Sequence, residues 1–517
     1  MSLNFATILT ENVRWHPNRV AVIDDERRMT FAELLQQARR FANVLSGLDL
    51  KPGDKVAIMS QNRLEYPIVY FGILMAGCVM VAVNMLLTER EVAHCLQDSD
   101  SKALITGEPV LPAAEPAFKK SPTCNHLIVL GERSADTIQG YMSFHGALRK
   151  ASDKADLFPT RADDPAAIIY TSGTTGVPKG ATLSHSNIFL TTHYLKQDFV
   201  GEQAPDNVGL TVVPPYVVGG VVGCMGAYLH AGAAITIVRR FDPELVLHVM
   251  KRERVTLFTG VPTMYIRMLQ CSSESLEALK TLRSAFSGAS AMPVEVLEAY
   301  RDRFGFTAIY EGWGCTESSG IATIQLPTRP HKFGSVGKPM WGVEVAAVNQ
   351  SDEFLPAGKD GELVIRGYNV MLGYYNRPEA NAETIRNGWL HTGDIGHYDD
   401  EGDFYIVDRL KDMIIRGGYN VYPREIEEIL YTMNGVREAA VIGIPDPVRG
   451  EEVCACISVD PSVGITEESV IAYCKQRLGA YKYPRKVIFF DSLPKNPTGK
   501  IVKRDLREIV AKGHRSR

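Results

Sequence analysis

Short apolar runs alternate with amphipathic segments through the first 300 residues of the chain. Residues 55–59, 79–83 and 103–106 are short apolar runs that are typical of buried strands, and the segments between them carry helical signals. Strands that alternate with helices favour a parallel sheet with both faces covered. The pattern therefore predicts an α/β architecture for this part of the chain.

Local signals mark the individual elements. A capping box, Thr30-Phe-Ala-Glu33, opens a helix that runs to Leu45. Other signals predict helices at 66–75, 89–97, 184–195 and 243–253, strands at 165–170, 210–213, 233–238, 256–259 and 282–286, and a short hairpin near 20–26. Residues 107–165 have a less regular pattern, and we predict little there.

The pattern changes after residue 343. Short alternating segments separated by turns extend to about residue 405, which predicts an antiparallel sheet or a small barrel. A helix at 422–430, strands at 438–442 and 453–459, and a helix at 467–478 follow. These elements predict a compact α+β unit at the C-terminal end.

Composition narrows the class of protein. A chain of 517 residues is too long for one core, and 45% hydrophobic with 22% charged residues is ordinary for a globular protein. The net charge of −4 does not favour binding to a nucleic acid, which is itself negatively charged. Nine cysteines without a C-x-x-C pair indicate a reducing compartment and no structural metal.

Targeting signals are not apparent in the sequence. The N-terminus lacks the basic and apolar regions of a signal peptide. The longest apolar stretch, 68–83, contains two glycines and is shorter than a membrane-spanning helix of about 20 residues. We therefore expect a cytoplasmic protein without a transmembrane segment.

Residues 171–180, Thr-Ser-Gly-Thr-Thr-Gly-Val-Pro-Lys-Gly, carry the strongest chemical signal. Four hydroxyls, three glycines and Lys179 can aim several donors and a positive charge at one anion, and polyphosphate is the natural ligand. The loop is not a Walker A motif, because Pro178 and Gly180 flank the lysine. A plain polar turn is the alternative, and the density of these groups argues against it.

Two further segments present polar groups on tight turns. In residues 309–317, Trp313 lies between two glycines and can stack on a base, and Glu317 is a hard oxygen ligand suited to Mg²⁺. The alternative is a buried tryptophan beside a solvated glutamate. Asp394, after Thr392 and Gly393, can accept hydrogen bonds from ribose hydroxyls, whereas an Asx turn is its commoner use.

The loop at 171–180 looks like the phosphate-loop signature of the acyl-adenylate-forming superfamily. That superfamily contains acyl- and aryl-CoA synthetases, adenylation domains of nonribosomal peptide synthetases, and firefly luciferase. At least five of its motifs occur in family order over nearly the whole chain, including 309–317, 389–394, 408–418 and 494–500. The chain resembles fatty-acid-CoA and 4-coumarate-CoA ligases in particular.

The resemblance implies roles for individual residues. The catalytic set is Lys179, Thr316, Glu317 and Lys500, with Glu317 as the metal ligand. The nucleotide- and CoA-binding set is Thr171, Ser172, Gly173, Thr174, Thr175, Gly176, Gly288, Ala289, Ser290, Glu311, Gly312, Trp313, Asp394, Arg409, Gly417 and Gly418. Without the resemblance, we would expect Lys500 to be an ordinary surface lysine.

The segment 216–228 is glycine-rich and free of charge, which indicates either close helix packing or room for a ligand. The superfamily's acyl pocket lies along the corresponding helix, so the resemblance favours an apolar pocket. The pocket residues we expect are Tyr216, Val217, Gly219, Gly220 and Gly223. Val217 stands where the superfamily often has a histidine, which makes the pocket more apolar here.

The resemblance also implies the domain organisation. We expect a large N-terminal domain at 1–408, made of two α/β subdomains plus a small antiparallel β-barrel-like subdomain. A hinge at 409–412, with Lys411 at the pivot, precedes a smaller, mobile α+β C-terminal domain at 413–517. Rotation about this hinge would let two faces of the small domain serve the site in turn.

The sequence therefore predicts an AMP-forming acid-thiol ligase that uses ATP, Mg²⁺ and coenzyme A. A medium- or long-chain fatty acid or an aryl acid is the expected substrate. A stand-alone adenylation enzyme that loads a carrier protein and a non-catalytic nucleotide-binding protein are the alternatives. The acid itself and a homodimeric state stay open.

Overall fold

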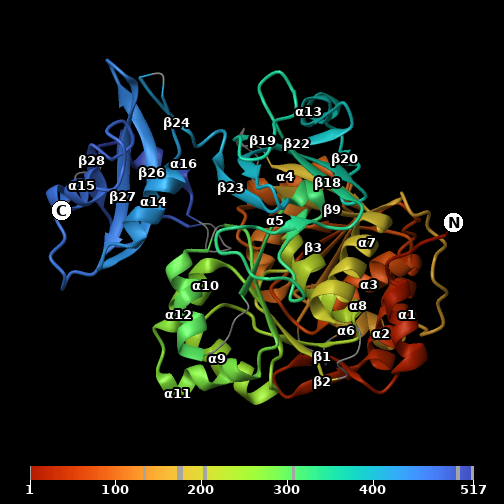
Figure 1. Cartoon of the computed structure of the whole chain (residues 1–517). Coiled ribbons are helices and arrows are strands. Elements are labelled where there is room, and N and C mark those ends of the chain that lie inside the picture. Colours follow the sequence, from red (N-terminus) through yellow and green to blue (C-terminus); the bar gives the residue numbers. More distant parts are fainter. Residues whose placement is uncertain are drawn as a thin grey trace.

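A computed structural model of the chain describes residues 2–131, 136–171, 178–201, 206–290, 292–304, 309–417, 419–495 and 501–513. Two nine-stranded sheets form the body, and a small domain lies beside them, drawn in blue in Figure 1. No helix in these ranges is long and apolar enough to cross a membrane.

The first sheet is parallel at its centre and antiparallel at its edges. Its order is β17-β16-β15-β14-β13-β11-β12-β1-β2, and β2, β16 and β17 run antiparallel to their neighbours. The strands are β1 (Val20–Asp24), β2 (Arg27–Thr30), β11 (Val208–Thr211), β12 (Ala234–Ile237), β13 (Leu257–Gly260), β14 (Ser284–Ser287), β15 (Ile309–Trp313), β16 (Thr323–Ile324) and β17 (Lys338–Pro339).

The second sheet follows the same plan, with the order β20-β10-β9-β4-β3-β5-β6-β8-β7. Its strands are β3 (Lys55–Met59), β4 (Val79–Ala82), β5 (Ala103–Gly107), β6 (His126–Leu130), β7 (Thr137–Ile138), β8 (Tyr141–Ser143), β9 (Pro165–Thr171), β10 (Lys179–Ser184) and β20 (Gly373–Tyr374). The sequence did not predict β10, which pairs antiparallel with β9, with Lys179 opposite Thr171.

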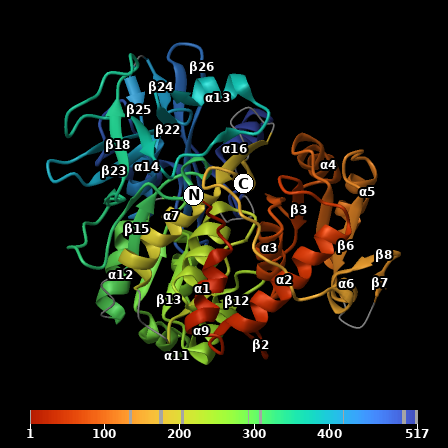
Figure 2. The ribbon, with the colours of Figure 1, turned by 90° about the vertical axis from the view of Figure 1, so that its right-hand side faces the viewer.

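Helices fill the space between the sheets and cover their outer faces. Figure 2 shows β3 and β6 on one side and β12, β13 and β15 on the other. The helices of this region are α1 (Thr7–Trp15), α2 (Phe31–Gly47), α3 (Glu65–Met75), α4 (Glu89–Asp98), α5 (Leu111–Lys119), α6 (Phe144–Lys150), α7 (His185–Leu195), α8 (Ala227–His230), α9 (Pro243–Glu253), α10 (Pro262–Leu269), α11 (Ser273–Leu276) and α12 (Val294–Phe304). Short 3₁₀ turns occur at Glu108–Val110 (η1), Glu277–Thr281 (η4) and Thr316–Ser318 (η5), and π-helical segments at Lys196–Val200 (η2) and Gly219–Gly226 (η3).

Helix α3 shows why the two sheets form one body. Every residue from Glu65 to Met75 is buried, as expected for a helix that is apolar on all sides and surrounded by protein. One continuous hydrophobic core includes side chains of α2, α3, β3, β4 and β12. The predicted capping box at Thr30 is present, with Glu33 N donating to Thr30 Oγ1 at 3.2 Å.

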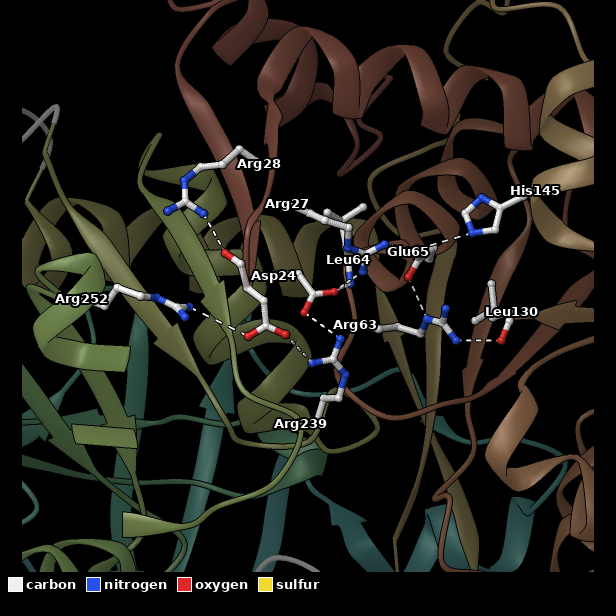
Figure 3. A network of polar contacts seen from close by, with 11 residues as sticks. Asp24, Arg27, Arg28, Arg63, Leu64, Glu65, Leu130, His145, Arg239 and Arg252 are labelled. Atoms are coloured by element: carbon white, nitrogen blue, oxygen red, sulfur yellow. Dashed lines mark hydrogen bonds and ion pairs between the residues drawn. The ribbon is translucent and has the colours of Figure 1, made fainter. Parts of the chain in front are cut away.

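An ionic network around the buried carboxylates of Asp24 and Glu65 ties the first sheet to the second (Figure 3). Glu65, at the start of α3, pairs with Arg27 of β2 at 2.9 Å and with Arg63 at 2.8 Å. Asp24 of β1 pairs with Arg27 and with Arg239. Arg63 also donates to the carbonyl oxygen of Leu130 on β6 at 2.7 Å, so the network links strands of the first sheet to a strand of the second.

The predicted antiparallel sheet is confirmed. It contains β18 (Val343–Val348), β19 (Gly361–Gly367), β21 (Ile385–Arg386), β22 (Trp389–Tyr398) and β23 (Phe404–Arg409), with α13 (Pro378–Thr384) beside it. All of its pairings are antiparallel. Its last strand, β23, leads directly into the small domain.

The small domain is the predicted α+β unit. One sheet of β24 (Ile414–Arg416), β25 (Tyr419–Val421), β26 (Val436–Asp446), β27 (Gly450–Val459) and β28 (Lys486–Phe489) packs with α14 (Pro423–Tyr431), α15 (Glu467–Lys475) and α16 (Lys503–Ala511). Residues 410–413 join it to the body. Arg507 of α16 pairs with Asp412 at 3.0 Å across this junction.

Candidate active site

The carboxyl end of β15 brings an indole, a carboxylate and a guanidinium together. Trp313 Nε1 donates to Asp394 Oδ2 at 2.8 Å, and Arg409 Nε lies 3.0 Å from Asp394 Oδ1. Asp394 and Arg409 are register partners on β22 and β23. The negative charge of Asp394 raises the pKa of Arg409 further, so the guanidinium stays protonated.

Trp313 is more enclosed than its glycine neighbours suggest. Only 8% of the residue is exposed, and its N–H is used within the protein. Gly312 and Gly314 are needed for close packing rather than for an open ring face. A Cβ on Gly312 would lie 2.8 Å from Phe286 and from the carbonyl oxygen of Thr323.

A second cluster lies around Tyr374, which the sequence analysis missed. Its hydroxyl donates to Glu317 Oε1 at 2.7 Å, and Lys179 Nζ lies 4.8 Å from the centre of its ring. Burial and the charge of Glu317 both raise the pKa of Tyr374. Tyr374 therefore stays neutral and lies in contact with both Lys179 of β10 and Glu317.

Glu311 is a buried carboxylate on β15. It accepts a hydrogen bond from Met292 N at 3.1 Å, whereas its Oε2 is buried and has no hydrogen-bond partner among the described residues. Burial raises the pKa of Glu311 to about 7. Such perturbed groups cluster at functional sites.

The loop after β14 lies next to β15. Ser287 of β14 and Glu311 are parallel register partners, and residues 288–290 follow at the strand's carboxyl end. Ala289 has a left-handed φ of 68°, and both Ala289 and Ser290 are exposed. Residues 288–290, which the sequence analysis placed near adenine, therefore lie beside β15 at the carboxyl edge of the first sheet.

A small cavity opens beside these groups. About 60 Å³ in volume, it is lined by Thr191, Leu195, Phe199, Val200, Gly219, Val222, Gly223, Ala227, Tyr228, Thr259, Phe286, Ser319, Gly320 and Ile321. Gly219 and Gly223 were expected there, whereas Tyr216, Val217 and Gly220 are not among these lining residues. The aromatic members come from three separate segments, so no local signal pointed to them.

Several expected site residues lie outside the described ranges: Ser172, Gly173, Thr174, Thr175, Gly176, Gly418 and Lys500. The ends of the phosphate loop are described, and Thr171 and Lys179 are register partners of β9 and β10. Gly417 has a left-handed φ of 57°, and its N–H donates to Arg449 O at 2.8 Å. Lys411 is exposed between β23 and β24.

Comparisons with known proteins show the family of the chain. The family described as "AMP-binding enzyme" matches residues 9–375, and "AMP-binding enzyme C-terminal domain" matches residues 425–500. A long-chain-fatty-acid–CoA ligase of Bacillus subtilis is 32% identical, over 98% of this chain and 95% of the relative.

A feruloyl-CoA synthase of an Amycolatopsis species is 36% identical, over 96% of both chains. The crystal structure of the anthranilate CoA ligase AuaEII with anthranoyl-AMP superposes with a TM-score of 0.92 at 29% identity, covering 99% of this chain and 98% of that one. These matches span both domains. The chain therefore belongs to the AMP-binding enzyme family.

Proposed function

We propose that the protein is an AMP-forming acyl-CoA synthetase. A carboxylic acid and ATP give acyl-AMP and pyrophosphate, and the acyl-AMP then reacts with the thiol of coenzyme A to give acyl-CoA and AMP. The observation that carries the proposal is the placement of the Trp313–Asp394–Arg409 and Lys179–Tyr374–Glu317 clusters beside an uncharged cavity. The full-length similarity to CoA ligases supports it.

The nucleotide would lie along the edge formed by β14, β15 and β22. Asp394 would accept from the ribose hydroxyls, with Arg409 holding its charge in place. Glu311 Oε2 offers a buried acceptor for the amino group of adenine. Thr316 and Lys179, with the hydroxyls of 171–175, would contact the phosphates.

Mg²⁺ fits the donors at this edge. Magnesium is often held by one or two carboxylates together with substrate phosphates. Glu317 supplies one carboxylate, and Tyr374 contacts only its Oε1. Bound there, the ion would neutralise charge on the phosphates.

Adenylation solves a chemical problem, because a carboxylate lacks an adequate leaving group. Its oxygen would attack the α-phosphorus of ATP, and the bond to pyrophosphate would break. Positive groups that face the phosphates lower the barrier by electrostatic stabilisation. We assign Lys500 to this step, and the segment at Gly417 and Gly418 to entry of the thiol.

One assay tests the reaction as a whole. Purified protein is incubated with Mg-ATP and a panel of carboxylic acids, and pyrophosphate and AMP release are measured with and without coenzyme A. Turnover that requires one class of acid and coenzyme A supports the proposal. Pyrophosphate release that coenzyme A does not accelerate would indicate a carrier-protein acceptor instead.

The division between two half-reactions gives a sharper test. Rotation about residues 409–412 would bring Lys500 and the Gly417 segment to the site in turn. We expect Lys500→Ala to abolish acyl-AMP formation, yet to retain thioester formation from supplied acyl-AMP. Loss of both half-reactions in a folded variant would contradict this assignment.

A further inference from the structure

Tyr374 contacts both of the charged groups that the proposed function assigns to the metal and the phosphates. Its hydroxyl donates to Glu317 Oε1 at 2.7 Å, and Lys179 Nζ lies 4.8 Å from the centre of its ring. Only 8% of Tyr374 is exposed, so protein surrounds the side chain and restricts its movement. One buried residue therefore links the carboxylate to the ammonium.

The backbone near Tyr374 is bonded to the segments that carry both partners. Strand β20, which contains Tyr374, pairs antiparallel with β10, which contains Lys179. Just before β20, Met371 N donates to the carbonyl oxygen of Glu317 at 2.8 Å. The strand that presents the tyrosine is therefore fixed relative to both groups that the side chain contacts.

Asn381 of α13 holds the main chain of Tyr374 with two hydrogen bonds. Tyr374 N donates to Asn381 Oδ1 at 2.6 Å, and Asn381 Nδ2 donates to Tyr374 O at 3.1 Å. Gly373 permits this approach, because its φ is 132° and a Cβ there would lie 2.8 Å from Asn381 Nδ2. The backbone thus holds the tyrosine in place independently of the hydroxyl contact with Glu317.

A hydrogen bond to a carboxylate that binds a metal fixes the direction of the ligand oxygens. The hydroxyl of Tyr374 engages Oε1 of Glu317, so the carboxylate is oriented before an ion arrives. Loss of such a partner typically weakens metal binding about 10–100-fold. The ring also restrains Lys179, since a cation is attracted to the face of an aromatic ring.

We propose that Tyr374 is a positioning residue, which orients the Glu317 carboxylate for Mg²⁺ and holds Lys179 beside it. The metal ion and the lysine would then meet the same phosphates. The inference rests on the proposed function, since it takes Glu317 as the ligand of the ion that accompanies ATP. It goes beyond that function, because Tyr374 lies in none of the motifs that the sequence analysis assigned to the site.

The test measures how much a divalent ion strengthens ATP binding. Calorimetry gives the Kd of ATP with Mn²⁺ and with EDTA, in the absence of a carboxylic acid so that no turnover occurs. The ratio of the two dissociation constants is the metal-dependent gain. Tyr374→Phe keeps the ring and loses the hydroxyl, so the gain should fall about tenfold, whereas the Kd with EDTA should stay within about threefold.

Tyr374→Leu removes the ring as well as the hydroxyl. With EDTA, it should bind ATP about two- to fivefold more weakly than Tyr374→Phe does, which is the effect of one cation–π contact. Equal binding by the two variants would overturn the part of the inference that concerns Lys179.

Tyr375 is the matched control, because it makes the same two kinds of contact with other partners. Its hydroxyl donates to Asp100 Oδ2 at 3.2 Å, and Lys55 Nζ lies 5.1 Å from the centre of its ring. Tyr375→Phe should leave the metal-dependent gain unchanged. A gain that falls equally in Tyr374→Phe and Tyr375→Phe would overturn the inference.

A double variant separates positioning from a general structural effect. If Tyr374 acts through Glu317, adding Tyr374→Phe to Glu317→Gln should lower the gain no further than Glu317→Gln alone. Losses that add in full would mean that Tyr374 acts independently of Glu317, which contradicts the proposal.

Binding and turnover distinguish this inference from the proposed function. If no acid supports turnover and the gain still falls in Tyr374→Phe, the positioning role holds and the synthetase reaction is wrong. A gain that is unchanged in Tyr374→Phe, or absent from the unchanged protein, overturns the positioning role whatever the activity.

Discussion

At the scale of single residues, Asp394 joins two groups that are distant in sequence. It accepts from the Trp313 N–H at 2.8 Å and balances Arg409 at 3.0 Å. Asp394 is 5% exposed, whereas the side chain of Arg409 is 43% exposed, so the carboxylate is buried and the guanidinium reaches the surface. Removing one partner of such a charge-assisted pair lowers stability, because the other partner is left without its counter-charge.

We expect Asp394→Asn to weaken ATP binding at least tenfold and to lower the free energy of unfolding by about 1–3 kcal/mol, because Arg409 loses its counter-charge. Calorimetric titration with ATP and urea denaturation measure the two effects. Asp360→Asn, at an exposed pair with His397, is a suitable control. Unchanged ATP affinity in the Asp394 variant would remove this residue from the nucleotide site.

Glu311 gives a prediction about pH. Burial raises the pKa of Glu311 from 4.5 to about 7, so the folded state holds the proton more tightly than the unfolded state. Stability is therefore lost as pH rises from about 4.5 to 7, by about 3 kcal/mol. The Glu311→Gln variant should lose much less stability over this pH range. Urea denaturation of both proteins at pH 5 and pH 8 would measure the difference.

The comparison at pH 5 is the control for that measurement. At pH 5 the free energies of unfolding of the Glu311→Gln variant and the unchanged protein should differ much less than at pH 8. A Glu311→Gln variant that keeps the full pH dependence would show that other groups cause it. Met292 N can still donate to the amide oxygen of the variant, so the local fold is preserved.

At the scale of elements, the π-helical segment η3 shows what spacing alone could not decide. Gly219, Gly220 and Gly223 all fall within eight residues of one element. The sequence supported either packing or room for a ligand, and the structure assigns both uses to different glycines. π-Helical segments are frequent at functional sites.

Gly220→Ala should be strongly destabilising, because its Cβ would lie 2.0 Å from the carbonyl oxygen of Pro214, a backbone atom that cannot move alone. We expect a loss of at least about 3 kcal/mol in the free energy of unfolding, or failure to accumulate as folded protein. Thermal unfolding measures this, with Gly219→Ala as the matched control. Equal melting temperatures for the two variants would contradict the packing role.

Elements with strong local signals could be predicted from the sequence. The capping box at Thr30, the runs around β3, β4 and β5, and the proline at the start of α14 are each encoded in adjacent residues. Strand β10 and the elements between 107 and 165 were missed. Their patterns are short or irregular, and pairing with distant strands decides their conformation.

At the scale of the whole molecule, the network around Glu65 connects the two large sheets (Figure 3). Glu65 is 1% exposed and lies among Arg27, Arg63 and, at 3.4 Å, His145. Burial alone would raise the pKa of Glu65, but hydrogen bonds and charge from these partners hold it well below its usual value. The carboxylate is therefore ionised in the folded protein at neutral pH.

Glu65→Gln should lower the free energy of unfolding by about 3–5 kcal/mol at pH 7, because Arg63 keeps its charge without a carboxylate partner and Arg27 keeps only Asp24. The difference should shrink progressively as pH falls below about 4.5, because the unfolded carboxyl then binds a proton while the folded carboxyl stays ionised until its own, lower pKa is reached. Chemical denaturation at pH 7 and pH 4 measures both.

Glu115→Gln is the matched control for that variant. Glu115 pairs with Lys119 four residues later on α5 at 2.6 Å and also accepts a hydrogen bond from the Tyr141 hydroxyl of β8 at 2.9 Å. Exposed helical pairs contribute about 0.3–0.5 kcal/mol, so this substitution should have a small effect. Similar losses from both substitutions would mean that the Glu65 network does not hold the sheets together.

The sequence by itself determined the fold class, the order of the family's motifs and the chemical identity of the groups at the candidate site, because each depends on neighbouring residues or short spacings. Only the tertiary structure decided which groups meet. Trp313 and Asp394 lie 81 residues apart, and Tyr374 reaches Glu317 across 57. These contacts depend on how separate sheets pack against one another. The difference between Gly220 and Gly223 also depends on packing, because a local sequence pattern does not specify which atoms will surround a residue in the folded protein.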